Sequence, residues 1–390
     1  MSASPVHFDN LQPARFVDRP NQFLVRCRTE GGGLVRAFLP NPGRMLELMF
    51  PDVTIYLTKE PRQRRGKGAS PPRKTRYTVV AVERDGRPLF LHTHMTNAVA
   101  RYLIENSKIP TLADAEIVDS EVTVGRSRFD FLLRDQGRLL YLEVKSCTLY
   151  GNGVAMFPDA VTERGRKHLL ELAEMARQGM RPVVLFVVHT PLVRWFMPDY
   201  HTDLAFSRTM LAVRDQLRIL PVSVSWTRDF RLGSEVRMLD IPWNYLHREV
   251  EDRGSYLLIL RLKRKRRVTV GQLGDLLFER GYYLYVGSAM GSLSPRIARH
   301  TRLRKKLRWH VDYLRQVADE VVPLPVVSSK RLECDMASAL SGLLGLGPPR
   351  FGSSDCDCPT HLFWSIDDPL DSRDFHHLLQ RFRMQEPDIP

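Results

Sequence analysis

Cysteine is scarce in this chain of 390 residues, which contains five: Cys27, Cys147, Cys334, Cys356 and Cys358. Such an odd and sparse set argues against a secreted scaffold held by disulfides and favours a reducing compartment. Long apolar runs are also missing. The most apolar run, Val183 to Val188, is far too short to cross a bilayer, and the first ten residues contain no stretch of signal-peptide type. We therefore expect a cytoplasmic protein with no membrane contact.

Acidic residues are outnumbered by basic ones. The chain has 58 Lys and Arg against 44 Asp and Glu, a formal net charge of +14. Lys59 to Arg76 holds eight basic residues and one acidic residue, and Lys263 to Arg267 is basic at all five positions. Such clusters favour DNA or RNA as a partner, because Lys and Arg neutralise phosphates directly. The alternative is a solvated basic surface that only keeps the protein soluble.

The pattern of expected strands and helices predicts three domains. Short alternating segments fill the first 95 residues and predict a small β-barrel or meander. Next come a helix from Asn97, three strands, a helix over 162–178 and a buried strand over 182–188, which together predict an α/β domain. The remaining strands are expected over 256–262 and 282–286, and the remaining helices over 294–304, 306–317 and 334–344. We expect a multidomain fold of α/β and β type, with domains over residues 1–95, 96–235 and 250–370.

Two strands around a turn at Asp135 to Gly137 carry the first candidate catalytic site. Antiparallel pairing across this turn places Asp130 beside Glu143, and alternation along the strand puts Glu143 and Lys145 on one side. Paired carboxylates suit Mg²⁺ or Mn²⁺, and Lys145 is placed to orient an attacking water. We therefore predict Asp130 and Glu143 as metal ligands and all three residues as catalytic. The alternative is an exposed ion pair on a surface hairpin.

Residues near this hairpin could support such a site. Arg164 and His168 share one face of the following helix at i,i+4 spacing, where they would meet a phosphate or order the site. The alternative is a solvated helix face. Glu121, on the preceding strand, is a candidate third carboxylate.

The hairpin and its surroundings resemble known families. Asp130 followed by Glu143-Val-Lys145 resembles the PD-(D/E)XK nuclease core. Longer motifs across residues 8 to about 228 are similar to the sugar fermentation stimulation protein A family; they lie at Phe16 to Phe23, Leu39 to Leu48, Ser127 to Leu132, Glu143 to Leu149 and Phe157 to His168. This resemblance implies an OB-fold domain that binds nucleic acid, followed by a nuclease-like domain, in a family regarded as both a DNA-binding regulator and a DNA or RNA nuclease. The candidate nucleic-acid-binding residues are Arg15, Arg19, Arg44, Arg65, Arg128, Arg164, His168, Lys263, Arg264 and Lys265.

The last third of the chain resembles a GIY-YIG nuclease module. Gly254-Ser-Tyr256 and Tyr285-Val-Gly287 supply the two tyrosine motifs, and Arg296 and Glu333 follow. The resemblance implies that Tyr256 or Tyr285 acts as general base, that Arg296 stabilises the phosphate and that Glu333 holds a metal ion. The alternative is a pair of strands with core tyrosines and a basic helix that faces DNA.

Cys356, Cys358 and His361, joined by Cys334, have the residue types of a tetrahedral zinc site. Their C-x-C spacing is tighter than the usual zinc knuckle, so buried free thiols in a small core are the favoured interpretation.

The sequence thus predicts a metal-dependent nuclease with Mg²⁺ or Mn²⁺ as cofactor. The alternative is a non-catalytic DNA-binding transcriptional regulator of sugar metabolism genes. The two differ in their need for the carboxylate pair, because juxtaposed Asp130 and Glu143 would repel phosphate in the absence of a metal ion.

Overall fold

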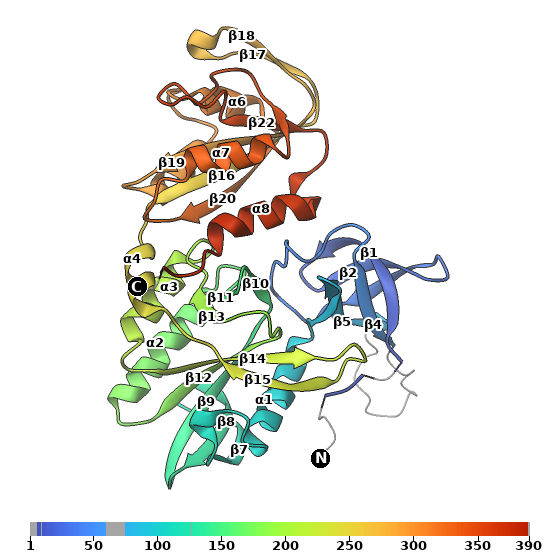
Figure 1. Cartoon of the computed structure of the whole chain (residues 1–390), viewed down its shortest axis with the longest axis vertical. Helices are drawn as coiled ribbons and strands as arrows, with labels where there is room; N and C mark the ends of the chain where they lie inside the picture. Colours follow the sequence, from blue (N-terminus) through green and yellow to red (C-terminus); the bar gives the residue numbers. More distant parts are fainter. Residues whose placement is uncertain (1–5, 9, 60–74, 126, 389–390) are drawn as a thin grey trace. The chain divides into compact units, whose positions relative to one another are not determined.

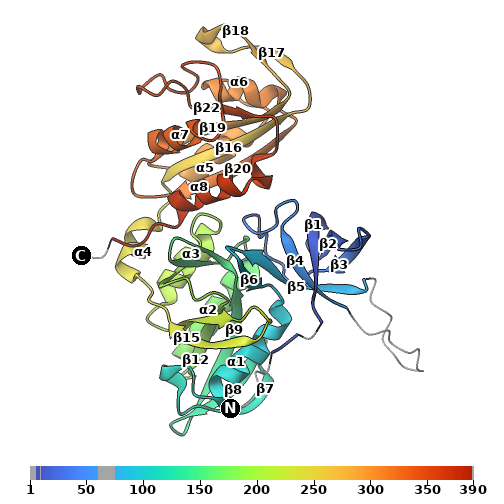
Figure 2. The ribbon, with the colours of Figure 1, turned by 45° about the vertical axis from the view of Figure 1, so that its right-hand side comes forward.

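The computed structural model describes residues 6–8, 10–59, 75–125 and 127–388. The chain forms two compact units (Figures 1 and 2). Unit 1 comprises Met1–Pro198 and Thr209–Pro242, and unit 2 comprises Asp199–Arg208 and Trp243–Pro390. Among the described residues, no helix is long and apolar enough to span a membrane.

Unit 1 begins with a closed barrel. Its strands run in the order β3-β2-β1-β4-β5-β6, and parallel pairing of β3 with β5 closes the sheet. Along β2, buried Val25 and Cys27 alternate with exposed Arg26 and Arg28, as expected for a strand with one face in a core. The strands are β1 (Gln12–Asn21), β2 (Leu24–Thr29), β3 (Leu34–Phe38), β4 (Thr54–Lys59), β5 (Tyr77–Arg84) and β6 (Arg87–Phe90). The predicted barrel is confirmed.

The second part of unit 1 is a six-stranded mixed sheet in the order β15-β14-β12-β9-β8-β7. Its strands are β7 (Glu116–Val124), β8 (Ser127–Asp135), β9 (Arg138–Cys147), β12 (Pro182–Val188), β14 (Arg218–Trp226) and β15 (Leu232–Met238). A separate small sheet contains β10 (Leu149–Gly151), β11 (Val154–Phe157) and β13 (Trp195–Pro198). All seven residues of β12 are buried, because β12 lies between β9 and β14 in the middle of the sheet. This agrees with the buried strand that the sequence predicts.

Two helices flank the sheet and position the candidate site. Helix α1 (Thr96–Glu105) packs Val99 and Leu103 against Leu142 and Val144 of the sheet. Helix α2 (Glu163–Arg177) lies on the side to which Glu143 points, opposite to Val144. The Thr162 side chain accepts a hydrogen bond of 3.0 Å from the Gly165 amide and so caps α2. Helix α3 (Leu204–Val213) follows β13.

Unit 2 is built on an antiparallel sheet in the order β20-β16-β19-β22-β21. Its strands are β16 (Gly254–Leu262), β19 (Gly281–Ala289), β20 (Glu320–Val327), β21 (Gly345–Leu346) and β22 (Leu362–Ser365), and β17 (Arg266–Thr269) and β18 (Asp275–Phe278) form a hairpin of their own. Its helices are α4 (Trp243–Glu249), α5 (Leu293–Thr301), α6 (His310–Val317), α7 (Glu333–Ser341) and α8 (Arg373–Arg383).

The helices of unit 2 bury both faces of its sheet. Met336 of α7 and Phe375 of α8 pack with Leu257 and Leu284 on one face. On the other face, His300 of α5 contacts Tyr256, with ring centroids 5.9 Å apart. Helix α6 begins at His310, later than the predicted start at 306. The reason is that the Trp309 amide donates a hydrogen bond of 3.1 Å to the Asp312 carboxylate, and this bond caps the helix there.

Candidate functional site

The register of the β8–β9 hairpin brings the two predicted carboxylates together. Phe131 pairs with Leu142, which places Asp130 beside Glu143 at the next position. Asp130 Oδ2 accepts a hydrogen bond of 2.7 Å from the Val144 amide. Its Oδ1 accepts one of 2.7 Å from Asn97 Nδ2 on α1. Both oxygens of Asp130 are therefore held by groups from two elements.

Glu143 lies at the centre of a charged cluster. It is buried, and its Oε1 contacts Lys145 Nζ and lies 3.4 Å from His168 Nδ1. Burial raises the pKa of Glu143 to about 7, and repulsion from Asp130 adds to this effect while Lys145 opposes it. Burial and the nearby charge of Lys145 lower the pKa of His168 to about 4, so this imidazole is neutral at neutral pH. Glu143 thus has a charged and a neutral partner that fix its position.

The donor set at this cluster fits a hard divalent cation. Asp130 and Glu143 provide carboxylate oxygens from neighbouring strands, the kind of ligand that Mg²⁺, Mn²⁺ and Ca²⁺ take. The buried Nε2 of His168, whose other ring nitrogen faces Glu143, has no hydrogen-bond partner among the described residues. Each Asp130 oxygen accepts one hydrogen bond and retains a lone pair for a ligand.

One residue of this cluster cannot be recognised from the sequence, and one residue predicted to join it lies outside it. Asn97 was expected only to open a helix, and its contact with Asp130 depends on how α1 packs on the sheet. Glu121 was the candidate third carboxylate, but it is exposed, has a φ of 58° and pairs with Arg128. The irregular backbone turns its side chain toward Arg128, so this prediction is wrong.

Several candidate nucleic-acid-binding residues make contacts within the protein. The Arg19 guanidinium donates to four backbone carbonyls, those of Gln22, Asn41, Gly43 and Arg44. Burial lowers its pKa, although Asp159 opposes that effect. Arg19 therefore holds the loop after β3 rather than facing a ligand. Its predicted role in binding nucleic acid is contradicted by these contacts.

The other predicted basic residues are more accessible. Arg15 is exposed and donates to the Asp52 carbonyl and, over 3.0 Å, to Thr54 Oγ1. Arg44 and Arg164 are exposed, and Arg65 lies outside the described residues. Lys263 lies 3.4 Å from Glu320, and Lys265 pairs with Glu279, which reduces the positive charge of that run; Arg264 is exposed between them.

The second predicted constellation also comes together, in unit 2. Tyr256 and Tyr285 have ring centroids 6.3 Å apart, and Arg296 and Glu333 interact electrostatically with both hydroxyls. Burial raises the pKa of Tyr256 and of Tyr285 above the ordinary value, so both hydroxyls stay protonated at neutral pH. A general base needs the opposite shift. The roles predicted for Tyr256, Tyr285, Arg296 and Glu333 stay predictions.

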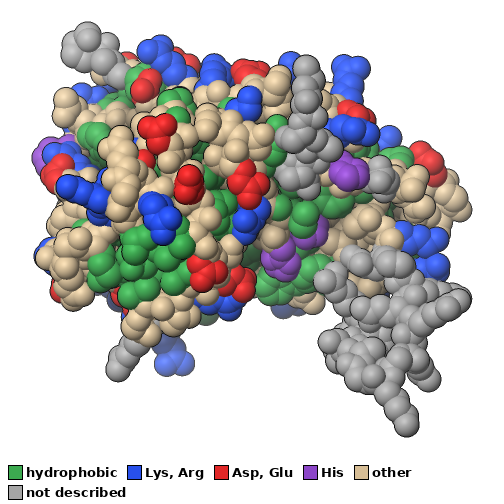
Figure 3. Space-filling model, turned by 90° about the horizontal axis from the view of Figure 1, so that it is seen from below, with side chains coloured by type: hydrophobic (Ala, Val, Ile, Leu, Met, Phe, Trp, Pro, Cys, Tyr) green, Lys and Arg blue, Asp and Glu red, His purple; other side chains and the backbone are tan. Residues whose placement is uncertain are grey.

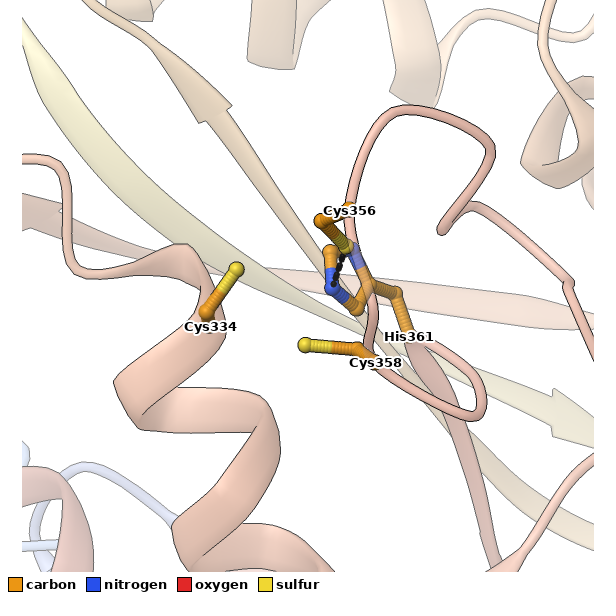
Figure 4. A group of neighbouring side chains, drawn as sticks. All are labelled: Cys334, Cys356, Cys358 and His361. Atoms are coloured by element: carbon orange, nitrogen blue, oxygen red, sulfur yellow. Dashed lines mark hydrogen bonds between the residues drawn. The ribbon is translucent and has the colours of Figure 1, made fainter.

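The four residues of the possible zinc site are neighbours. One potential ligand atom from each of Cys334, Cys356, Cys358 and His361 lies within 4.8 Å of the others (Figure 4). Cys334 is exposed, and Cys356 and Cys358 are partly exposed. The favoured interpretation is right in that the thiols are free, but none of the three is fully buried: Cys334 is exposed, and Cys358 packs only partly buried against the core of unit 2.

Comparisons with known proteins match almost the whole chain in three parts. Residues 17–91 match the SfsA N-terminal OB domain, residues 94–230 match the sugar fermentation stimulation protein RE domain, and residues 255–384 match the domain of unknown function DUF123. The third description names no activity, so the resemblance to GIY-YIG nucleases stays a prediction.

Relatives and a solved structure cover the first two parts. The sugar fermentation stimulation protein homolog of Clostridium kluyveri is 38% identical over 202 residues, which is 52% of this chain and 84% of that protein. The homolog of Methanosphaera stadtmanae is 35% identical over 219 residues, 56% of this chain and 88% of its own. The structure of Pyrococcus furiosus SfsA in complex with Ca²⁺ is 26% identical, with a TM-score of 0.53, and the match covers 62% of this chain and 99% of that one. The chain therefore belongs to the sugar fermentation stimulation protein family and carries a DUF123 domain after the family's OB and RE domains.

Proposed function

We propose that this protein is a metal-dependent nuclease that cleaves DNA or RNA at the cluster of Asp130, Glu143 and Lys145. The observation that carries the proposal is the juxtaposition of two carboxylates in a sheet, with Lys145 Nζ on Glu143. A protein that only binds nucleic acid gains nothing from these acids, because they repel phosphate. The solved relative from Pyrococcus furiosus was obtained in complex with Ca²⁺, which supports a divalent cation here as well.

Each residue of the cluster has a role that follows from its contacts. Asp130 and Glu143 would hold Mg²⁺ or Mn²⁺, and the bound ion would polarise the scissile phosphate and lower the pKa of an attacking water. Lys145, in contact with Glu143, orients that water and offsets the negative charge that develops on the phosphate. Asn97 and the Val144 amide keep Asp130 in place, and His168 does the same for Glu143. Arg164, exposed one helical turn before His168, is available to a phosphate of the substrate.

The barrel offers a surface on which bases can stack. A hollow of about 500 Å³ is lined by Phe23, Phe38, His94 and Arg36 among others. Phe23 and Phe38 stack with ring centroids 6.3 Å apart, Phe38 and His94 lie 6.2 Å apart, and Phe23 is 45% exposed. Aromatic rings beside an arginine are the means by which OB-folds bind single strands. We assign this hollow as the site that holds a single-stranded part of the substrate.

One face of the molecule shows charges of both signs. On the face drawn in Figure 3, Lys and Arg side chains are interspersed with Asp and Glu rather than gathered into one basic patch.

Replacing Phe23 with Ala should weaken binding of single-stranded DNA by about 1–3 kcal/mol, because one stacked base loses its partner. Fluorescence anisotropy with a labelled oligonucleotide in EDTA would measure this without cleavage. Leu34→Ala is the matched control, since Leu34 is an exposed apolar residue of the same barrel that does not line the hollow. Equal affinities of the Phe23 and Leu34 variants would contradict the assignment.

The proposed function is tested by incubating the purified full chain with single-stranded DNA, duplex DNA and RNA. Each substrate is offered with Mg²⁺, with Mn²⁺ and with EDTA. We expect cleavage of at least one substrate in the presence of a metal ion and none in EDTA. Intact substrates under every condition, with binding still detectable, would favour a non-catalytic binding protein instead.

A further inference from the structure

The cysteine cluster of unit 2 joins two segments that are distant in the sequence. Cys334 lies at the start of α7, whereas Cys356, Cys358 and His361 belong to the segment that leads into β22 (Figure 4). That segment closes on itself through two backbone hydrogen bonds: the Arg350 amide donates to the Pro359 carbonyl over 2.7 Å, and the His361 amide donates to the Phe351 carbonyl over 2.8 Å. The fold therefore presents all four side chains to one point.

The geometry of these side chains fits a tetrahedral site. Ligand atoms around a zinc ion lie about 3.5–3.8 Å apart, given Zn–S near 2.3 Å and Zn–N near 2.0 Å. His361 Nε2 already lies 3.4 Å from Cys356 Sγ, and all four ligand atoms lie within 4.8 Å of one another. A small inward movement of partly exposed side chains closes the site. Three sulfur donors and one imidazole select zinc over Mg²⁺ or Ca²⁺, which prefer oxygen.

The second ring nitrogen of His361 points to a carboxylate. His361 is 1% exposed, and its Nδ1 lies 3.3 Å from Glu333 Oε1. The other oxygen of Glu333, Oε2, accepts a hydrogen bond of 2.6 Å from Ser288 Oγ on β19. A histidine that binds a metal ion through one nitrogen commonly donates its other N–H to a carboxylate, which fixes the ring. Glu333 is in the position of that partner.

We propose that Cys334, Cys356, Cys358 and His361 form a structural zinc site that fastens α7 to the segment before β22. Zinc binds three thiolates and the neutral imidazole, so the thiol protons are released to solvent as the site fills. Through His361, the site also orients Glu333. Gly352 belongs to the segment that the site fastens, and it packs so closely on Tyr285 that an added Cβ would lie 2.6 Å from the ring. The site therefore supports both Glu333 and Tyr285 of the second constellation.

The proposal is tested on the reduced full chain by measuring its metal content with inductively coupled plasma mass spectrometry. We expect about one zinc ion per chain in the wild type and in Cys27→Ala, which removes a thiol of the barrel core. Cys334→Ser and Cys358→Ser should lose most of the zinc. The proposal would be overturned if wild-type protein contained no zinc after incubation with Zn²⁺ and removal of the excess, or if either serine variant held a full equivalent of zinc.

A second measurement covers the case in which the serine variants fail to fold. Wild-type protein stripped by a chelator is titrated with Co²⁺, and its absorption spectrum should show a tetrahedral thiolate site that added Zn²⁺ abolishes and Mg²⁺ does not. The melting temperature should fall on chelation and recover with Zn²⁺. No thiolate–cobalt band, or a disulfide among these cysteines in protein kept under reductant, would show that the cluster is not a zinc site.

Discussion

The Glu143→Gln variant should lose metal-dependent cleavage by more than about 100-fold. Residues that only support a metal ligand cost roughly 10–100-fold when they are removed, so the loss of a ligand itself should cost more. The substitution keeps the size of the side chain and removes the charge that would hold the cation. Because Glu143 is buried beside Asp130, the metal-free variant should fold at least as well as the wild type. Initial cleavage rates over a range of Mg²⁺ concentrations measure the effect.

Glu121→Gln is the control for this variant. Glu121 is an acid on the neighbouring strand β7, but it is exposed and paired with Arg128 outside the cluster. We expect it to cut at the wild-type rate. Lys145→Ala should bind Mg²⁺ as the wild type does and cut more slowly, since Lys145 acts on water and phosphate. Equal losses in the Glu121 and Glu143 variants would show that acids in this region act only through general charge.

The Asp312→Asn variant should destabilise unit 2 by about 3–5 kcal/mol, the usual cost of breaking a buried ion pair by removing one partner. Asp312 is fully buried and contacts Arg299, His300 and Lys305. It also accepts hydrogen bonds from the Arg308 and Trp309 amides. Asparagine cannot balance these charges, and the contact of α5 with α6 would weaken as a result.

Urea unfolding of the full chain measures this loss of stability. Hydrogen exchange in α5 and α6 then shows whether the loss falls on these two helices. Asp374→Asn is the matched control, because Asp374 is exposed in the first turn of α8. Burial opposes ionisation of Asp312, but hydrogen bonds from His300 and Arg299 hold the pKa of its carboxyl far below the usual range. The stabilisation is therefore complete above the ordinary aspartate pKa and disappears only as the pH falls below it. A variant as stable as the control would contradict this role of Asp312.

The first candidate site was accessible to sequence reasoning because it is local. One tight turn sets the register of β8 and β9, and this register alone brings Asp130 to Glu143. Alternation then places Lys145 beside Glu143. In the same way, Thr162 and the apolar residues after it predict α2 from neighbours in the sequence.

The features that sequence reasoning missed depend on tertiary packing. Asn97 reaches Asp130 only because α1 crosses the sheet at that point. Glu121 turned away from the site because its backbone has a positive φ that alternation does not predict. The accessibility of Cys356 and Cys358 depends on how the segment before β22 closes on itself. Arg19 is a basic residue of the kind that contacts phosphate, and only the fold shows that its Nη1 and Nη2 already donate to backbone carbonyls.

The central claim is that unit 1 contains the nuclease centre. The most direct measurement compares cleavage of one substrate in Mg²⁺ by the wild type, by Asp130→Asn and by Arg296→Ala. The rates are compared only if the three proteins bind that substrate equally well in EDTA. We expect Asp130→Asn to be inactive and Arg296→Ala to cut as the wild type does. Cleavage by Asp130→Asn at the wild-type rate would show that the cluster in unit 1 is not the nuclease centre. If Arg296→Ala were inactive as well, the chemistry would lie in unit 2.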